Sequence, residues 1–485
     1  MNNWDVVADV VVLGSGGAAL TAAITAHDFG AEEVVIVEKS NMVGGTTAMS
    51  GGQLWIPNNL YENDEGIDDS WDEVVTYLNS LAPEQLDPEV LEGFLAGGPE
   101  MIHHLTDRTA VRFRTMTGFP DYQPDKPGAK AEGGRTLDSL VFPFAELGNW
   151  ATRVVPPKFG PPILTTYYEN AHLGRLDAEI MDERKRTDSR GQGQALIGGL
   201  LKAVLDRDIE FYFEHRAIKL HKEGNRITGV ILETLDGERN FQARRGVVIA
   251  TGGFEWNKEL VQIFLRGPMT GPVGVPENEG DGLVMAIEAG AKLGNMSNAF
   301  WMSSTLEGKP QHRDAKPNYL LCQNERVAPG SILVNRLGRR FVNEATNYNV
   351  LGMSLHAFDP NTHDYPNLPY YLIFDQRFRE RYPYPIFGNR PGEPMSEMII
   401  EAESLEALAG LLEIDAEGLV ATVARFNDMV ERGHDDDFQR GDNAFDNYWG
   451  DPGFEPPYRT LGRLDQPPFY AVKMEAGVLG TNGGP

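Results

Sequence analysis

The sequence of 485 residues contains a single cysteine, Cys322. One thiol cannot form an internal disulfide, and an iron–sulfur centre or a thiolate zinc site needs several cysteines. The histidines show no spacing typical of metal ligands, so we predict no metal site. Scarce cysteine also fits a reducing compartment, and we expect the protein in the cytoplasm.

Long apolar runs are absent as well. No run reaches the roughly 18 apolar residues of a membrane-spanning helix. The first residues lack the basic and then apolar order of an export signal. We therefore expect neither a transmembrane segment nor Sec-dependent export.

Basic residues are few: 43 lysines and arginines stand against 71 aspartates and glutamates, which gives a formal net charge of −28. Such a surface repels nucleic acid and acidic membrane faces, so we predict no nucleic-acid partner. The same field repels a diphosphate cofactor, which strong local donors must therefore hold. A small neutral substrate avoids this repulsion.

The rest of the composition is that of a folded globular protein, with 41% hydrophobic and 24% charged residues. At roughly 150 residues per domain the length allows two or three domains, and we favour two. The chain opens with an apolar strand over residues 9–13, a helix over 18–29 and a buried strand over 33–38. This βαβ unit predicts an α/β fold with a Rossmann-like domain and a parallel sheet.

The turn between the first strand and the helix matches the dinucleotide-binding pattern G-x-G-x-x-G/A, with alanine in the third place. Its residues are Gly14, Ser15, Gly16, Gly17, Ala18 and Ala19. The first glycine allows a tight turn, the second lets the backbone approach a pyrophosphate, and the alanine keeps helix and sheet close. Unpaired amides at the helix start then supply the donors that the acidic chain requires.

Glu38 ends the second strand, at the distance where an acid accepts hydrogen bonds from ribose hydroxyls and repels a 2′-phosphate. NADP is therefore a poor candidate. The alternative is that the glycines only make a tight turn and that Glu38 is a solvated strand end. The joint spacing favours cofactor binding.

A second glycine-rich stretch covers residues 44–52, with too many glycines and hydroxyls for an ordinary helix or strand. It is typical of a cradle in which amides and hydroxyls donate to a phosphate and to a flavin ring. Taken alone, the stretch is also explained by a flexible surface loop. Its candidate binding residues are Gly44, Gly45, Thr46, Thr47, Ser50, Gly51 and Gly52.

Further along, the pattern is mainly helical from residue 57 to 160, with a loop rich in proline and glycine over 119–135. Four elements are predicted next: a helix over 194–205, a strand over 209–215, a hairpin over 217–232 that turns at Gly224-Asn225, and a strand over 246–250. Helices and short strands such as 331–334 indicate a second domain from about residue 275. Residues 469–474 are predicted as a strand that returns to the first domain.

Four motifs together resemble the flavoprotein subunit family of fumarate reductase and succinate dehydrogenase: Gly14-Ser15-Gly16, Glu38-Lys39, Gly44-Gly45-Thr46-Thr47 and Ser50-Gly51-Gly52. The resemblance covers nearly the whole chain. Other stretches look like its 3-ketosteroid dehydrogenase branch: 55–59, Pro120-Asp121-Tyr122 with 126–128, and 334–344 with its Asn-Glu pair at 343–344.

The resemblance implies an FAD-binding domain over residues 1–275 and 466–485, interrupted by an α+β catalytic cap over 276–465. The substrate then lies between the flavin and the cap. The resemblance also assigns Lys39, Ala217, Thr251 and Gly252 to FAD, with Ala217 near the adenine. No histidine beside the stretch over 44–52 resembles the covalently flavinylated relatives, so we expect non-covalent FAD.

Tyr348 is the most informative single position, because fumarate reductases of the family have a proton-delivering arginine in the corresponding place. A phenol suits the proton beside a ketone better than a guanidinium does, provided its surroundings adjust its pKa. By resemblance, Tyr348 takes that proton while flavin N5 accepts hydride from the neighbouring carbon. The same resemblance implies that Tyr122 is a second site tyrosine that supports Tyr348. Both also have a purely structural explanation as packed aromatics.

The resemblance thus implies FAD-dependent desaturation of a 3-ketosteroid, with electrons passed to a carrier that the sequence does not identify. One alternative is a fumarate or enoate reductase, which needs a positive clamp for carboxylates. Another is a flavin-binding protein without turnover.

The sequence stops at residues 480–485, within what resembles a motif that continues in the family. There the next segment carries a tyrosine and an amide that polarise the ketone, and it bears on whether the 1,2 or the 4,5 bond is desaturated. We expect a chain ending here to bind FAD weakly and to turn over slowly.

Overall fold

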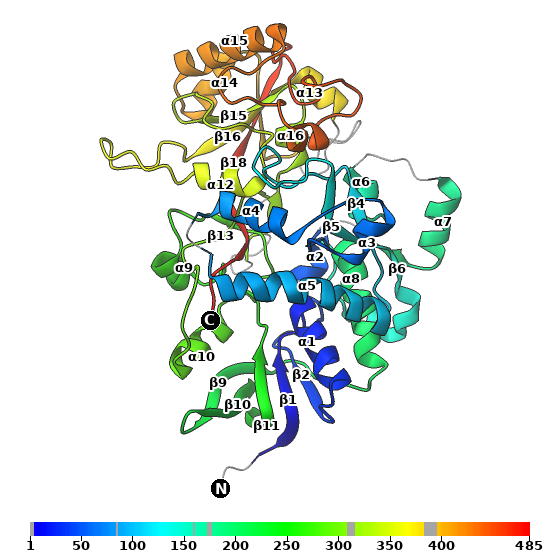
Figure 1. Cartoon of the computed structure of the whole chain (residues 1–485). Helices are drawn as coiled ribbons and strands as arrows, with labels where there is room; N and C mark the ends of the chain where they lie inside the picture. Colours follow the sequence, from blue (N-terminus) through cyan, green and yellow to red (C-terminus); the bar gives the residue numbers. More distant parts are fainter. Residues whose placement is uncertain (1–3, 84–85, 159–160, 172–176, 308–315, 383–394) are drawn as a thin grey trace.

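The computed structural model describes residues 4–83, 86–158, 161–171, 177–307, 316–382 and 395–485. Two large sheets lie near opposite ends of the molecule, and helices pack between and around them (Figure 1). The predicted mixed architecture, a Rossmann-like sheet joined to an α+β part, is confirmed.

The first sheet contains the predicted βαβ unit. Strand β1 (Val6–Leu13) pairs in parallel with β2 (Val34–Val37) and with β11 (Gly237–Ile249). The helix α1 (Gly17–Asp28) links β1 to β2 and buries Ala19, Leu20, Ala23 and Ile24. The other members of the sheet are β8 (Glu210–Tyr212), β9 (Arg216–Glu223) and β10 (Arg226–Thr234). The predicted hairpin turn at residues 224–225 is confirmed, since β9 and β10 flank it.

The turn after β1 depends on glycine at one position. Gly14 has a φ of 103°, and a Cβ there would collide with the carbonyl oxygen of Ala250, the residue after β11. Glycine alone allows this conformation and this approach without strain. The Gly14 amide donates to the Val37 carbonyl at 2.7 Å. The turn is therefore fixed between the carboxyl ends of β2 and β11.

The second glycine-rich stretch contains a helix that the composition did not predict. Residues Gly45–Met49 form α2, preceded by Gly44 with a φ of 116°. The helix is short, and it packs against α8 (Gln192–Leu205), the long buried helix predicted over 194–205. Tertiary packing thus overrides the poor helix propensity of the glycine and threonine residues.

A middle layer lies beside α5 (Pro88–Arg108) and α4 (Trp71–Leu81) (Figure 1). A three-stranded sheet joins β3 (Leu54–Trp55), β5 (Gly133–Ser139) and β4 (Phe113–Thr117). The predicted loop over 119–135 is therefore too long by three residues, because 133–135 already belong to β5. Smaller elements complete this region: α3 (Leu60–Asp64), β6 (Phe142–Pro143), the 3₁₀ segment η1 (Phe144–Arg153), α6 (Tyr167–Ala171), α7 (Ala178–Arg186) and β7 (Ser189–Arg190).

The second sheet has the order β14-β13-β18-β16-β15, with β12 and β17 also paired to β18. Its strands are β12 (Gly271–Pro272), β13 (Ala299–Leu306), β14 (Tyr319–Leu321), β15 (Ser331–Asn335), β16 (Tyr370–Asp375), β17 (Ile399–Ala402) and β18 (Phe469–Thr481). The accompanying helices are α9 (Lys258–Phe264), α10 (Asp281–Ala289), α11 (Asn324–Val327), α12 (Tyr348–Ser354), α13 (Gln376–Arg381), α14 (Leu405–Leu412), α15 (Ala416–Arg432) and α16 (Ala444–Trp449).

Strand β18 is longer than the predicted strand over 469–474, and its two halves have different neighbours. Phe469–Met474 pairs with β16, so this half lies inside the second sheet and does not return to the first. The other half, from Glu475 on, pairs with β13 and β12. A continuous apolar run shows that a strand is buried, but it does not show its partner. The domain bounds at 275 and 465 stay a prediction.

Candidate active site

A cavity of about 570 Å³ lies where the carboxyl ends of β1, β2 and β11 face β13, α12 and β18. This is the edge at which parallel sheets of this type hold their ligands. Most of the predicted site residues line it: Gly14, Ser15, Gly16, Ala18, Glu38, Lys39, Gly45, Thr46, Thr47, Ser50, Ala217, Thr251, Gly252 and Tyr348.

Five other predicted site residues are not among the residues that line this cavity: Ala19, Gly44, Gly51, Gly52 and Tyr122. Ala19 lies on the buried face of α1 and packs in the core. Gly44 and Gly52 let α2 and the following turn approach α8, and a Cβ on Gly52 would lie 2.5 Å from the Gln192 backbone. Gly51 packs against the ring of Tyr167. Ala19 and the three glycines have a packing role in the described structure.

Glu38 reaches the cavity with both carboxylate oxygens already engaged. Ser15 Oγ donates to Oε2 at 2.6 Å, and the Ser40 amide donates to Oε1 at 2.9 Å. Each oxygen keeps room for a second donor. The carboxylate is thus oriented in advance at the end of β2.

Lys39 contributes less positive charge to the cavity than its sequence position suggests. Its ammonium lies 2.8 Å from a carboxylate oxygen of Asp281 and 3.3 Å from Glu279. Arg216, next to Ala217 in the chain, pairs with the same Asp281 at 2.6 Å. Two basic and two acidic side chains therefore form an ion-pair cluster, of which Lys39 and Asp281 line the cavity.

Several lining residues were not predicted from the sequence. They are Ser40, Gln53, Val155, His215, Val275, Glu277, Asn278, Asp281, Phe300 and residues 479–481. The stretch over 274–282, rich in glycine and acids, was the available signal for Asn278 and Asp281. The sequence gave no indication that Asn278 contacts Thr46, because the two residues are more than 200 positions apart.

The two predicted tyrosines meet at the wall of the cavity. Tyr122 donates its hydroxyl hydrogen to the Tyr348 hydroxyl oxygen at 3.1 Å, and their rings are nearly perpendicular at 5.5 Å. Tyr348 lines the cavity and is the first residue of α12. Asn347 caps this helix by accepting from the Val350 amide, and it donates to the Tyr122 carbonyl at 3.1 Å. One side chain therefore holds both tyrosines.

Burial raises the pKa of Tyr348, and the hydrogen bond from Tyr122 partly opposes this rise. Desolvation is the main cause that raises the pKa of Tyr122, and the neighbouring Tyr348 raises it further. Tyr122 nevertheless has 38% of its surface accessible to solvent. The directions agree with the geometry, because Tyr122 donates and so stabilises the ionised form of its acceptor. Of the pair, Tyr348 is therefore the tyrosine whose ionised form the hydrogen bond favours, and so the candidate base.

A buried ion cluster fixes the residue before Tyr122. The Asp121 carboxylate accepts hydrogen bonds from Trp55 Nε1 at 2.7 Å, from the Lys130 amide at 2.9 Å and from Arg135 at 2.8 Å. Arg135 is 1% exposed and also binds Asp69 through two hydrogen bonds. Burial raises the pKa of Asp121 even so, which shows that its desolvation is costly.

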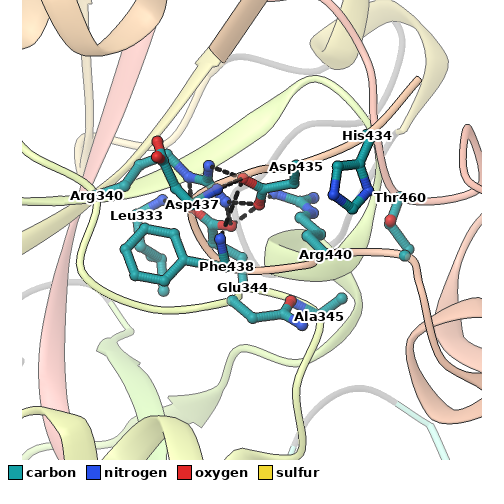
Figure 2. A network of polar contacts seen from close by, with 12 residues as sticks. Leu333, Arg340, Glu344, Ala345, His434, Asp435, Asp437, Phe438, Arg440 and Thr460 are labelled. Atoms are coloured by element: carbon teal, nitrogen blue, oxygen red, sulfur yellow. Dashed lines mark hydrogen bonds and ion pairs between the residues drawn. The ribbon is translucent and has the colours of Figure 1, made fainter. Parts of the chain in front are cut away.

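A second buried cluster fixes the segment before Tyr348 (Figure 2). Arg340 binds Glu344 through two hydrogen bonds at 2.8 and 2.7 Å and reaches Asp435 at 2.7 Å. Arg440 donates to Glu344 at 3.1 Å and to four backbone carbonyls. The two guanidinium groups hold the pKa of Glu344 below its usual range despite its complete burial. The Asn-Glu motif singled out in the sequence thus anchors the start of α12.

The described part of the chain lacks two features that would indicate another kind of site. It holds no helix with the length and apolar character to cross a bilayer. It also holds no group of three or more histidine, cysteine or acidic side chains arranged for a metal ion.

With the geometry established, comparison with known proteins identifies the family. A model described as FAD binding domain matches residues 9–484. The chain belongs to this family. Its 3-ketosteroid dehydrogenase branch is supported by two relatives. A 3-oxosteroid 1-dehydrogenase of Mycobacterium tuberculosis is 34% identical over 98% of this chain and 88% of the relative. The structure of 3-ketosteroid delta1-dehydrogenase from Sterolibacterium denitrificans superposes with a TM-score of 0.89 at 32% identity, over 99% and 89% of the two chains.

Another relative has a different substrate in its name. A 4-oxocyclohexanecarboxylate 2-dehydrogenase of Sinomonas cyclohexanicum is 39% identical over 98% of this chain and 83% of the relative. A flavocytochrome c3 fumarate reductase, 20% identical with a TM-score of 0.63, shares the fold. The predicted FAD is confirmed, and this member of the FAD-binding family is an oxidoreductase that acts on CH–CH donors.

The residues of the cavity fit FAD. Gly16, the N-cap of α1, has no side chain, and the Gly17 amide donates to Thr47 Oγ1 at 3.1 Å. The start of the helix still offers partial positive charge to a diphosphate. Gly14 and Gly252 form part of the wall of the cavity. A Cβ on Gly14 would collide with Ala250, and a Cβ on Gly252 would collide with Asn278. The Glu38 carboxylate is placed for ribose hydroxyls at the end of β2. These assignments of single residues to FAD are proposals.

The Asp121 cluster generates a stability prediction. Asp121→Asn keeps the shape and the acceptor for Trp55 but turns an amide toward Arg135, so a buried guanidinium loses one carboxylate. We expect the free energy of unfolding to fall by about 3 kcal/mol in urea titrations. Asp125→Asn, an exposed change in the same loop, should change it by less than about 0.5 kcal/mol. Equal effects of the two variants would contradict the buried ion pair.

Proposed function

We propose that this FAD-binding protein desaturates the ring of a 3-ketosteroid, next to its ketone. The observation that carries the proposal is the Tyr122–Tyr348 hydrogen bond at the wall of the cofactor cavity. A phenol that accepts from another phenol is suited to remove a weakly acidic proton beside a carbonyl. An arginine at position 348 would suit a dicarboxylate, and this chain has none there.

The chain's own residues divide the work in this proposal. Tyr348 Oη takes the proton from the carbon beside the ketone, because it faces the cavity. Tyr122 stays protonated and donates to Tyr348 Oη, which stabilises the negative charge that Tyr348 carries before it acts. Asn347 keeps the two hydroxyls together. Bound FAD supplies the acceptor for the hydride from the adjacent carbon.

The charges around the cavity favour a neutral substrate. Its lining includes the acids Glu38, Glu277 and Asp281 and a single lysine, Lys39, which is paired with two acids. No arginine is among the described lining residues. A carboxylate entering this cavity meets no unpaired cation there, whereas a steroid ketone carries no charge.

A second candidate substrate is a small oxocyclohexanecarboxylate. It is favoured by the 39% identity to the 4-oxocyclohexanecarboxylate 2-dehydrogenase, which is above the 34% of the steroid relative. The two candidates share a ring ketone and the same abstraction of a proton, so the tyrosine pair serves both. They differ in charge and in size.

The first test removes the proposed base. We expect Tyr348→Phe to lower kcat with the accepted ring ketone by about 100- to 10,000-fold while FAD stays bound, as for loss of a general base. Turnover is measured with an artificial electron acceptor, and FAD content by absorbance. Tyr458→Phe, a half-exposed tyrosine outside the cavity, is the control. Normal turnover of FAD-loaded Tyr348→Phe would refute the role.

A second test uses pH. The ionised form of Tyr348 is the base, so kcat/KM should rise with pH until the pKa of Tyr348 is passed. The hydrogen bond from Tyr122 lowers that pKa. Removing it in Tyr122→Phe should therefore move the rising limb to higher pH and lower the rate at neutral pH. An unchanged pH profile would separate Tyr122 from the proton transfer.

The third test decides between the substrates. Flavin bleaching under anaerobic conditions is followed with a 3-ketosteroid, with 4-oxocyclohexanecarboxylate and with its methyl ester. We expect the steroid to bleach the flavin fastest and the ester to react faster than the acid, since the cavity offers no unpaired cation. Faster bleaching by the free acid than by steroid and ester would instead establish the small carboxylate as the substrate.

A further inference from the structure

A buried glutamate lies directly behind the wall of the cavity. Glu255 follows the turn of Thr251, Gly252 and Gly253 and is 1% exposed. Its Oε2 atom lies against Gly253, where a Cβ would collide with it. The tyrosine mechanism does not use this carboxyl group, and burial without a charged partner is costly. Its position therefore calls for a role.

Asn278 connects this glutamate to the cavity. Its Nδ2 atom donates to Glu255 Oε1 at 2.7 Å and to Thr46 Oγ1 at 3.0 Å. Both amide hydrogens are thereby used. The amide is tightly enclosed, because a Cβ on Gly252 would lie 2.5 Å from Asn278 Oδ1.

Thr46 is the end of this chain of contacts. Its Oγ1 atom accepts hydrogen bonds from Asn278 Nδ2 and from the Val275 amide, the latter at 3.3 Å. A hydroxyl has two lone pairs and one hydrogen, so both lone pairs are occupied. The hydrogen must point to another acceptor. Thr46 lines the cavity, so the hydrogen is available to a ligand there.

The direction of this hydrogen depends on which end of the Asn278 amide faces Thr46. An ionised carboxylate only accepts, so Glu255 turns the NH₂ end of Asn278 toward itself and toward Thr46. With the amide reversed, Oδ1 would face both groups, and the Thr46 hydroxyl would donate to Oδ1. The cavity would then lose a donor.

We propose that Glu255 is a positioning residue that, through the Asn278 amide, directs the Thr46 hydroxyl hydrogen to an acceptor atom of FAD. This inference rests on the proposed placement of FAD in the cavity. It explains why an acid is buried beside the site of an anionic cofactor in a protein with a charge of −28. Through Asn278, Glu255 keeps the Thr46 hydroxyl available as a hydrogen-bond donor to the cofactor.

The experiment is a double-mutant cycle on FAD affinity. Apoprotein is titrated with FAD at about pH 8.5, where Glu255 is ionised because burial raises its pKa only to about 7. Thr46→Val removes the hydroxyl, and Glu255→Met removes the acceptor at similar shape. Each single variant should raise the Kd for FAD about tenfold, the effect of losing a hydrogen bond to a charged group. The double variant should match Thr46→Val within about twofold.

Matched variants make the result specific. Glu255→Gln retains an acceptor oxygen for Asn278, so its Kd should stay within about threefold of the wild type. Glu259→Met, the same change at an exposed position nearby, is the control for the loss of a glutamate. If Glu255→Met does not fold, Asn278→Asp takes its place, because it offers Thr46 only acceptors and should raise the Kd about tenfold.

The outcomes separate this inference from the proposed function. If the folded Glu255→Met protein binds FAD as tightly as the wild type, or if its loss is undiminished in the Thr46→Val background, the inference is overturned. If the wild-type protein does not bind FAD at all, the proposed FAD site and the proposed function are both refuted. A tenfold single loss and a non-additive double variant support the inference.

Discussion

The arrangement of the site depends on one close approach, that of the turn after β1 to the carbonyl of Ala250. Only glycine at position 14 permits it, because the backbone has a positive φ and leaves no room for a Cβ. The approach brings the carboxyl ends of β1, β2 and β11 together and aims α1 at the space beside them. Glu38, Thr251 and the α1 amides face one cavity as a consequence.

The sequence predicted those parts of the fold in which local pattern and final structure agree. The apolar run of β1, the alanine-rich α1 and the turn at residues 224–225 are examples, since their signals lie within a few neighbouring residues. The prediction failed where distant packing decides. Gly45–Met49 becomes helical because α8 covers it, and β18 joins the second sheet because β16 and β13 lie beside it.

The site divides in the same way. The glycine turn and Glu38 follow from spacing, whereas the two tyrosines, 226 positions apart, came from resemblance alone. No pattern indicated that Asn347 contacts both the Tyr122 carbonyl and α12, or that Asn278 joins Glu255 to Thr46. Each of these amides joins two groups that are distant in the sequence, which is a property of three-dimensional proximity and leaves no periodic signal.

Both clusters that anchor the tyrosines bury charge, and in the Asp121 cluster the attraction does not repay the desolvation of the carboxylate. Asp121 keeps a raised pKa although Arg135 lies 2.8 Å away. Apolar residues of the same size would serve stability as well or better. Apolar residues would not fix the relative orientation of two segments, whereas hydrogen bonds between a guanidinium and a carboxylate do. Two hydroxyls that must meet from distant segments require such orientation, and this accounts for buried ion pairs behind Tyr122 and Tyr348.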